Sequence, residues 1–171
     1  MVVVGYHAHV AAINNRNQAV GWRNDLEYPY AILWDDTVEV TLLGEKALAI
    51  NDSSDVLAAG DARSHATLEK GDGSVIFLEE TIPGLDKYAP NSGLSDINDS
   101  RQFIGTRDIA GEIRPFLWEA GTVYGVEADE PGWEITTVQK INDHGQILGT
   151  AEQASSGRSG PVLLTPTPGN S

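Results

Sequence analysis

The chain has 171 residues, no cysteine and a net charge of −14, from 25 acidic and 11 basic side chains. Without cysteine, neither a disulfide framework nor a thiolate metal site can form. The acidic balance argues against nucleic acid and anionic membrane surfaces as partners, because both need a basic footprint. No apolar run is long enough to predict membrane insertion, and no basic region precedes the apolar first residues, so the sequence predicts no signal peptide.

A motif recurs four times along the chain. Each copy is Ile-Asn followed, a few residues later, by Gln, two apolar residues and Gly; the second copy is decayed. The copies begin at Ile13, Ile50, Ile97 and Ile141, which are 37, 47 and 44 residues apart. A short apolar run follows each copy in phase. These runs end at Trp34, Leu78, Trp118 and Leu164. Self-similarity at this period predicts a repeat architecture.

Short apolar runs separated by Gly, Asn and Asp predict an all-β chain. In chain order, the repeat divides a single domain, residues 1–166, into units at roughly 1–36, 37–80, 81–120 and 121–166. The first unit is expected to open with residues 2–4 as its inner strand. Residues 167–171 are expected to form a disordered tail.

The best-preserved unit is the last, which predicts four antiparallel strands near 122–126, 133–141, 146–150 and 161–164. Four such strands in about 46 residues are typical of a propeller blade. The chain is therefore predicted to form four such units in a β-propeller or an open propeller-like array. Four units are few for ring closure. Two alternatives therefore stay open: the chain associates with itself to complete a propeller, or it is part of a longer propeller. A solenoid is the competing architecture.

The motif has a backbone explanation. Ile is expected to close a strand on its core side, with all four Ile residues equivalent and buried. Asn can bond the backbone two residues on, and a Gly in the turn adopts positive φ at little cost. The Gly that ends the motif would leave room for a neighbouring backbone.

This combination resembles the HAF repeat family of bacterial, probable extracellular proteins, named for a His-Ala-Phe triplet. The likeness is closest at 115–122, 132–136, 141–149 and 163–166. The triplet itself is replaced by Tyr30-Ala31-Ile32 and Arg114-Pro115-Phe116. The resemblance implies a propeller-like fold and an extracellular or cell-surface location. The family has no known function.

Two groups of residues are candidate metal ligands. His7 and His9 would share one face of a strand, but no third ligand is visible. The loop Asn51-Asp52-Ser53-Ser54-Asp55 alternates oxygen ligands as calcium loops do, without the Glu and central Gly of a helix-loop-helix site. Because it coincides with the repeat turn, backbone chemistry explains it better, as it does Asn98-Asp99 and Asn142-Asp143. No metal or cofactor is predicted.

The densest acidic cluster is Glu127, Asp129, Glu130 and Glu134. Paired carboxylates could serve glycoside hydrolysis, although a solvated acidic loop is the commoner meaning. Asp35 and Asp36 are expected in a turn. Of the four tryptophans, Trp34, Trp118 and Trp133 lie in repeated strands and are expected in the core, and Trp22 is the best candidate for an exposed, sugar-stacking ring.

The two sequons, Asn51-Asp52-Ser53 and Asn98-Asp99-Ser100, arise from the repeat itself. No catalytic residues are assigned. The sequence favours a non-enzymatic repeat module, secreted or surface-associated, that binds an unidentified protein or glycan. The alternative is a carbohydrate-active enzyme or lectin that uses the acidic residues 127–134 and Trp22.

Overall fold

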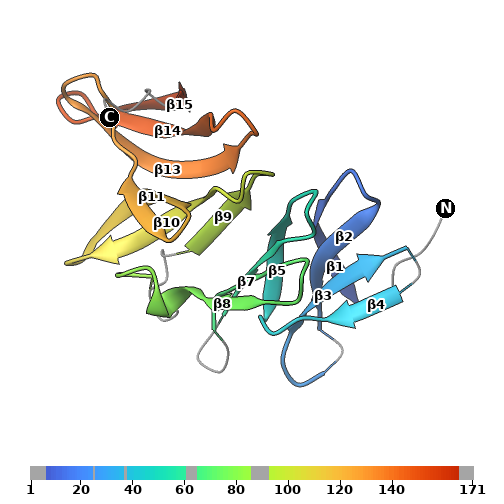
Figure 1. The fold of residues 1–171 in the computed structure, drawn as a ribbon. Coiled ribbons are helices and arrows are strands. Elements are labelled where there is room, and N and C mark those ends of the chain that lie inside the picture. Colours follow the sequence, from blue (N-terminus) through green and yellow to red (C-terminus); the bar gives the residue numbers. More distant parts are fainter. Residues whose placement is uncertain (1–6, 25, 37, 61–64, 86–92, 166–171) are drawn as a thin grey trace.

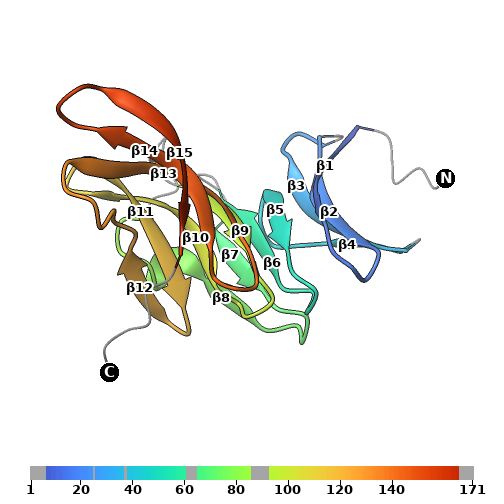
Figure 2. The same ribbon diagram turned by 90° about the horizontal axis from the view of Figure 1, so that it is seen from above.

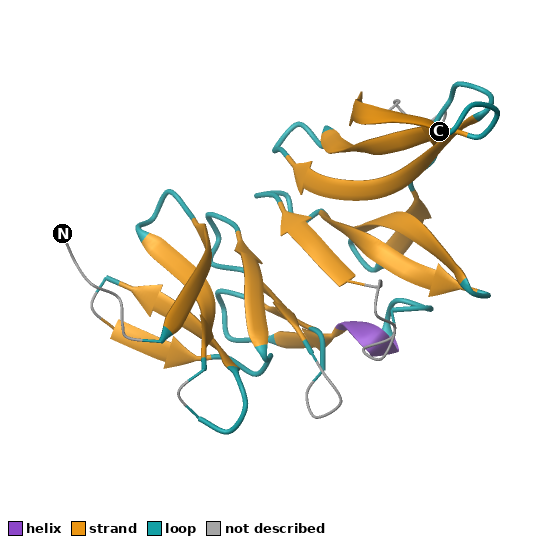
Figure 3. Cartoon of the chain, turned by 180° about the vertical axis from the view of Figure 1, so that it is seen from behind, coloured by secondary structure: helices purple, strands orange, loops and turns teal. Residues whose placement is uncertain are grey.

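The computed structural model describes residues 7–24, 26–36, 38–60, 65–85 and 93–165. In these ranges the chain forms four antiparallel sheets that follow one another along an arc (Figure 1). The one helical element described is a short 3-10 helix, η1 (Leu78–Glu80), at the end of the second sheet (Figure 3). None of the described residues forms a helix with the length and apolarity to cross a membrane. The prediction of an all-β, open propeller-like array is confirmed.

Within each sheet the strands lie side by side in chain order. Sheet 1 contains β1 (Ala8–Ile13), β2 (Gln18–Arg23), β3 (Tyr30–Asp35) and β4 (Val38–Thr41). Sheet 2 contains β5 (Lys46–Ile50), β6 (Val56–Ala59), β7 (Thr67–Glu69) and β8 (Val75–Phe77). Sheet 3 contains β9 (Gly93–Ile97), β10 (Phe103–Ile109), β11 (Glu112–Glu119) and β12 (Thr122–Gly125). Sheet 4 contains β13 (Trp133–Ile141), β14 (Ile147–Gln153) and β15 (Arg158–Leu164).

The sheets begin one strand later than the predicted units. β12 was expected to open the fourth unit, but it pairs with β11 and forms the outer strand of sheet 3. β4 likewise pairs with β3 in sheet 1, although the predicted second unit, residues 37–80, contains it. Sheet 4 consequently has three described strands. The expected strand at residues 2–4 and the tail at 167–171 lie outside the described residues.

The Gly that ends the motif leaves room for a neighbouring backbone, as predicted. The first strand of every sheet carries a bulge opposite the second strand. A Cβ added at Gly21 would lie 1.8 Å from the His9 carbonyl oxygen, and one at Gly149 would lie 2.3 Å from that of Thr137. Only a residue without a side chain fits these approaches while the bulge stays in place. The decayed second copy has Ala58 at this position, and Gly44 leaves the room there: a Cβ added at Gly44 would lie 2.3 Å from Ala58 Cβ.

Three apolar clusters fill the joints between neighbouring sheets. Three of the repeated Ile residues, Ile50, Ile97 and Ile141, pack against the preceding sheet and are buried at 7%, 5% and 7% exposure. Ile13 was expected to be buried as well, and this prediction is wrong: its side chain is 71% exposed. The four positions are equivalent in register, but no sheet in the described part of the chain precedes sheet 1 and covers Ile13.

The four turns that join the first and second strands of the sheets converge on one side of the arc. We call them the hub turns; they begin at Asn14, Asn51, Asn98 and Asn142. Together they line a shallow hollow of about 230 Å³. The fifth motif residue is left-handed in every hub turn: Asn17, Ser54, Arg101 and Gly145 have φ between 60° and 73°. The view from above shows sheets 1 and 4 at opposite ends of the arc (Figure 2).

Candidate functional site

Each hub turn is closed by its own Asn side chain. In the second turn Asn51 Oδ1 accepts from the backbone N–H groups of Ser53, at 3.0 Å, and Asp55, at 2.8 Å. The same pair of bonds forms in the other three turns. This bond to the backbone two residues on is what the sequence predicted, and it explains why one residue type recurs at these four positions.

The Asn side chains also join one sheet to the next, which the sequence did not reveal. Asn14 Nδ2 donates to the carbonyl of Asn51 at 3.0 Å, Asn51 to that of Asn98 at 3.1 Å, and Asn98 to that of Asn142 at 2.9 Å. A second row runs beside the first. The backbone N–H groups of residues 15, 52 and 99 donate to the carboxylates of Asp52, Asp99 and Asp143. The hub turns therefore form a ladder in which each turn donates to the next.

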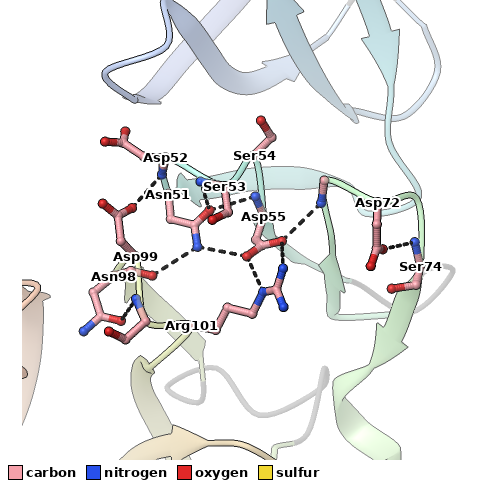
Figure 4. A network of polar contacts seen from close by, with 12 residues as sticks. Asn51, Asp52, Ser53, Ser54, Asp55, Asp72, Ser74, Asn98, Asp99 and Arg101 are labelled. Carbon is pink, nitrogen blue, oxygen red and sulfur yellow. Dashed lines mark hydrogen bonds and ion pairs between the residues drawn. The ribbon is translucent and has the colours of Figure 1, made fainter.

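The loop considered for calcium is occupied by protein groups. Asp55 is fully buried, and both of its oxygens accept from Arg101, whose Nε lies 2.6 Å from Oδ2 (Figure 4). Asn51 Nδ2 and the N–H of Gly71 complete its partners, at 2.9 and 3.1 Å. The carboxylate thus joins sheets 2 and 3, and this pairing raises the pKa of Arg101. Among the described residues, no group of three or more His, Asp or Glu could hold a metal ion.

A hollow of about 700 Å³ lies between sheets 3 and 4; we call it the cleft. It arises from side-chain size at equivalent positions. In sheet 3, Phe103, Phe116 and Trp118 point toward sheet 2, and Phe103 stacks on Trp118 at 4.7 Å. The strand registers place Ile147, Val162 and Leu164 at the same positions of sheet 4. These smaller side chains leave the wedge between the two diverging sheets partly empty.

The lining of the cleft combines an apolar floor with acidic and aromatic residues. Ile147, Val162 and Leu164 lie on the floor, and the rim includes exposed Glu127, Asp129 and Glu130. Those three carboxylates form no ion pair with another described residue, although the charge of Arg114 acts on Glu127 from a greater distance. Tyr124, 48% exposed, and half-buried Trp133 line the same space. An aromatic surface beside unpaired carboxylates suits a ligand with positive charge or hydroxyl groups.

The structure divides the residues that the sequence grouped as a sugar site. Glu134 faces a neighbouring hollow and pairs with Arg114 at 2.9 Å. Trp22 lies in sheet 1, separated by two sheets from the acidic rim. Its ring stacks on His9 at 5.0 Å, with Lys46 Nζ 5.9 Å from the ring centre. The aromatic residues beside the carboxylates are Tyr124 and Trp133. Tyr124 lies in β12 and Trp133 begins β13, so the two flank the acidic run in sequence, and this closeness was the available signal.

The other candidates have ordinary structural positions. Trp34 and Trp118 are in the core, at 4% and 6% exposure, as predicted, whereas Trp133, which was also expected there, is half-buried and lines the cleft. Trp34 Nε1 donates to Glu39 at 3.0 Å. His9 lies in β1 while His7 precedes it in a left-handed conformation, so strand alternation does not place the two on one face. Asp35 ends β3 and accepts from Gln18, and Asp36 is left-handed, as turn residues are.

Comparison with known proteins supports the fold alone. No family model matches the chain, and no curated protein sequence matches it. Among solved structures, the chain is similar to the β-propeller domain of the trilobed protease from Pyrococcus furiosus, described as having an open velcro topology. The TM-score is 0.55 and the sequence identity 11%. The match covers 95% of this chain and 52% of that one, so the chain spans about half the length of its propeller neighbour.

Proposed function

We propose that the chain is a non-enzymatic interaction module that binds a basic, partly apolar protein segment in the cleft between sheets 3 and 4. The observation that carries this proposal is the set of unpaired carboxylates, Glu127, Asp129 and Glu130, above an apolar floor. Lys and Arg side chains match both features, because their stems pack on apolar surface while their charged ends reach carboxylates. Tyr124 and Trp133 add cation–π contacts to the same ligand.

The net charge of −14 supports this choice of ligand, since a strongly acidic surface raises the encounter rate with basic partners and repels acidic ones. The resemblance to HAF repeats adds the proposal that the module works outside the cell or at its surface. Propeller scaffolds carry many unrelated functions, so the propeller neighbour does not by itself favour an enzyme or a binding protein.

A peptide-binding experiment tests the proposal. Fluorescently labelled Lys- and Arg-containing peptides with interspersed Leu are titrated with the protein and followed by anisotropy. We expect saturable binding that weakens as salt is raised, because rim charges are screened. Leu164→Trp should abolish it by restoring the large side chain that sheet 3 has at this position and so filling the cleft.

Charge variants give the matched control. Glu127→Gln with Glu130→Gln should weaken peptide binding about tenfold or more, the range for two charge-assisted contacts. Glu152→Gln removes an exposed carboxylate from β14 of sheet 4, outside the cleft, and should leave binding unchanged. Equal losses in both variants would show that net charge alone attracts the peptide, and would refute the cleft as the site.

A glycan ligand is the second candidate, favoured by the two aromatic rings that line the cleft. Sugars stack on Tyr and Trp and bond to carboxylates, with little dependence on salt. Screening glycans for binding and hydrolysis separates the two. A glycan hit that survives high salt and is lost in Trp133→Ala would replace the peptide proposal. Hydrolysis lost in Glu127→Gln or Glu130→Gln would make the protein an enzyme.

A further inference from the structure

The last hub turn has the hydrogen-bond donors that the other turns use to bond to the next sheet, but no described sheet offers it an acceptor. Asn142 Nδ2 bonds only to Gln146 of its own turn, at 2.9 Å, within the described part of the chain. The backbone N–H of Asp143 bonds to no described residue. Asn142 is exposed, whereas Asn51 and Asn98 are each 3% exposed because the next turn covers them.

The first hub turn has the matching acceptor half. The carbonyl of Asn14 accepts nothing from the described residues, although the carbonyls of Asn51, Asn98 and Asn142 each accept from the preceding turn. Asn15 occupies the position of the Asp that accepts in the other turns. Its side-chain oxygen is an acceptor like that of Asp, and its Nδ2 already donates to Asp52 at 2.8 Å.

The apolar surfaces at the two ends match in the same way. Leu148 and Leu163, the C-terminal face, are 42% and 64% exposed. The strand registers align Leu148 with Val20, Leu57 and Ile104, which are all fully buried against the next sheet. At the other end Val10 and Ile13, the N-terminal face, are 54% and 71% exposed.

We propose that two copies of this chain close a ring head to tail, with the C-terminal face of each copy on the N-terminal face of the other. The contact repeats the joint that the chain already makes three times, with Asn142 Nδ2 donating to Asn14 of the second copy. The occupant is a second copy because both halves of the joint lie on this chain. The propeller neighbour is about twice as long, so two copies supply about the length of one propeller.

The symmetry of the contact makes a definite prediction about assembly. A head-to-tail contact is heterologous, and it closes when the rotation per copy brings the last face onto the first. Light scattering coupled to gel filtration, at about 1 to 100 µM, should show twice the chain mass of 18.3 kDa. A folded protein that remains monomeric over this range, or that grows into larger assemblies, would overturn the two-copy ring.

Variants at exposed residues test each face without disturbing a core. Ile13→Arg blocks the N-terminal face and Leu163→Arg the C-terminal face, and each should be monomeric. The control is Leu43→Arg, at an equally exposed Leu, 58%, in the connection between sheets 1 and 2, which should still form the dimer. Circular dichroism establishes that all three are folded. Dimers in both blocked variants would refute the proposal.

Mixing the two blocked variants distinguishes a head-to-tail contact from a symmetric one. Ile13→Arg keeps an intact C-terminal face and Leu163→Arg an intact N-terminal face, so an equimolar mixture should regain a dimer through one joint. A contact between two identical faces would respond to only one substitution and would gain nothing from mixing. A mixture that stays monomeric would therefore disprove head-to-tail closure.

Discussion

The carboxylate of Asp55 accepts hydrogen bonds from donors in two neighbouring sheets at once. It lies fully buried, with Arg101, Asn51 and Gly71 all donating to it. A buried charge is tolerated only when its hydrogen-bonding capacity is met, and four donor groups meet it here. Asp55 is thus an internal anchor between neighbouring sheets, and its oxygens are not available as ion ligands.

Calcium should therefore have no specific effect on stability. We expect equal melting temperatures in millimolar calcium and in chelator, within about 1 °C, because a tight site would add several kcal/mol at such excess. Thermal denaturation followed by circular dichroism measures this. A rise beyond about 5 °C that disappears in Asp55→Asn would show that the loop binds the ion after all.

Acid should weaken the hub ladder through Asp52. Hydrogen bonds from Asn15, mainly from its side chain and then from its backbone, hold the pKa of Asp52 below its ordinary value of 3.8. A lowered folded-state pKa means that the stabilisation is complete above the unfolded-state value and is lost as pH falls through the folded-state one. Urea unfolding of wild type and Asp52→Asn from neutral pH down to about pH 2 should show a steeper acid loss in wild type. Parallel curves would contradict this.

At the scale of elements, the bulge in the first strand and the Gly opposite it depend on each other. Gly149→Ala should lower the free energy of unfolding by about 1 to 3 kcal/mol, since the new Cβ would lie 2.3 Å from the Thr137 carbonyl oxygen. Gly160, on the adjacent strand, has open space where a Cβ would lie, so Gly160→Ala is the matched control and should be near neutral. Equal losses in chemical denaturation would refute the steric explanation.

The joint between sheets 2 and 3 depends on large aromatic side chains. Trp118→Ala should cost about 3 to 5 kcal/mol, because Trp118 is 6% exposed and stacks on Phe103. Half-buried Trp22 supplies the comparison, and Trp22→Ala should cost clearly less. Chemical denaturation of both variants provides the measurement. A loss below about 1 kcal/mol for Trp118→Ala would mean that the core relaxes around the gap.

The spacing of the repeated sheets could be predicted from sequence, but the boundaries between one sheet and the next could not. The motif and the apolar runs recur once per sheet. This gives the spacing between sheets but not which strand is the first of each sheet. Which strand begins a sheet is decided by long-range pairing, such as β12 with β11, and this leaves no local signal in a short strand. The predicted units are therefore shifted by one strand, although most of the strands themselves are placed well.

At the scale of the molecule, stability should be uneven along the arc. Sheets 2 and 3 are covered on both faces and sheets 1 and 4 on one, so in a stacked array the end sheets open first. Hydrogen exchange of Ile13→Arg, in which closure between copies is blocked, should be slowest in β6 and β10 and faster in β2 and β14. Uniform protection over all four sheets would contradict this gradient.

Position along the arc also explains what the sequence could and could not say about the site. The burial of Ile50, Ile97 and Ile141 follows from the repeat, but Ile13 has the same motif and lies exposed because it is first. The cleft depends on a comparison between sheets, small Val162 against large Phe116, that requires the register. Sequence alone groups Trp22 with the acidic run because it contains no measure of the distance between the end units.

The ladder at the hub has a consequence for how such chains arise. Every joint of the ladder uses the same donor and acceptor groups, so a whole sheet added or lost by duplication or deletion within a gene leaves the remaining ladder bonds in place. A substitution at a single Asn, by contrast, impairs its own turn and its bond to the next. Ancestry by copying in whole units is accordingly an easier route for this architecture than gradual change at the hub.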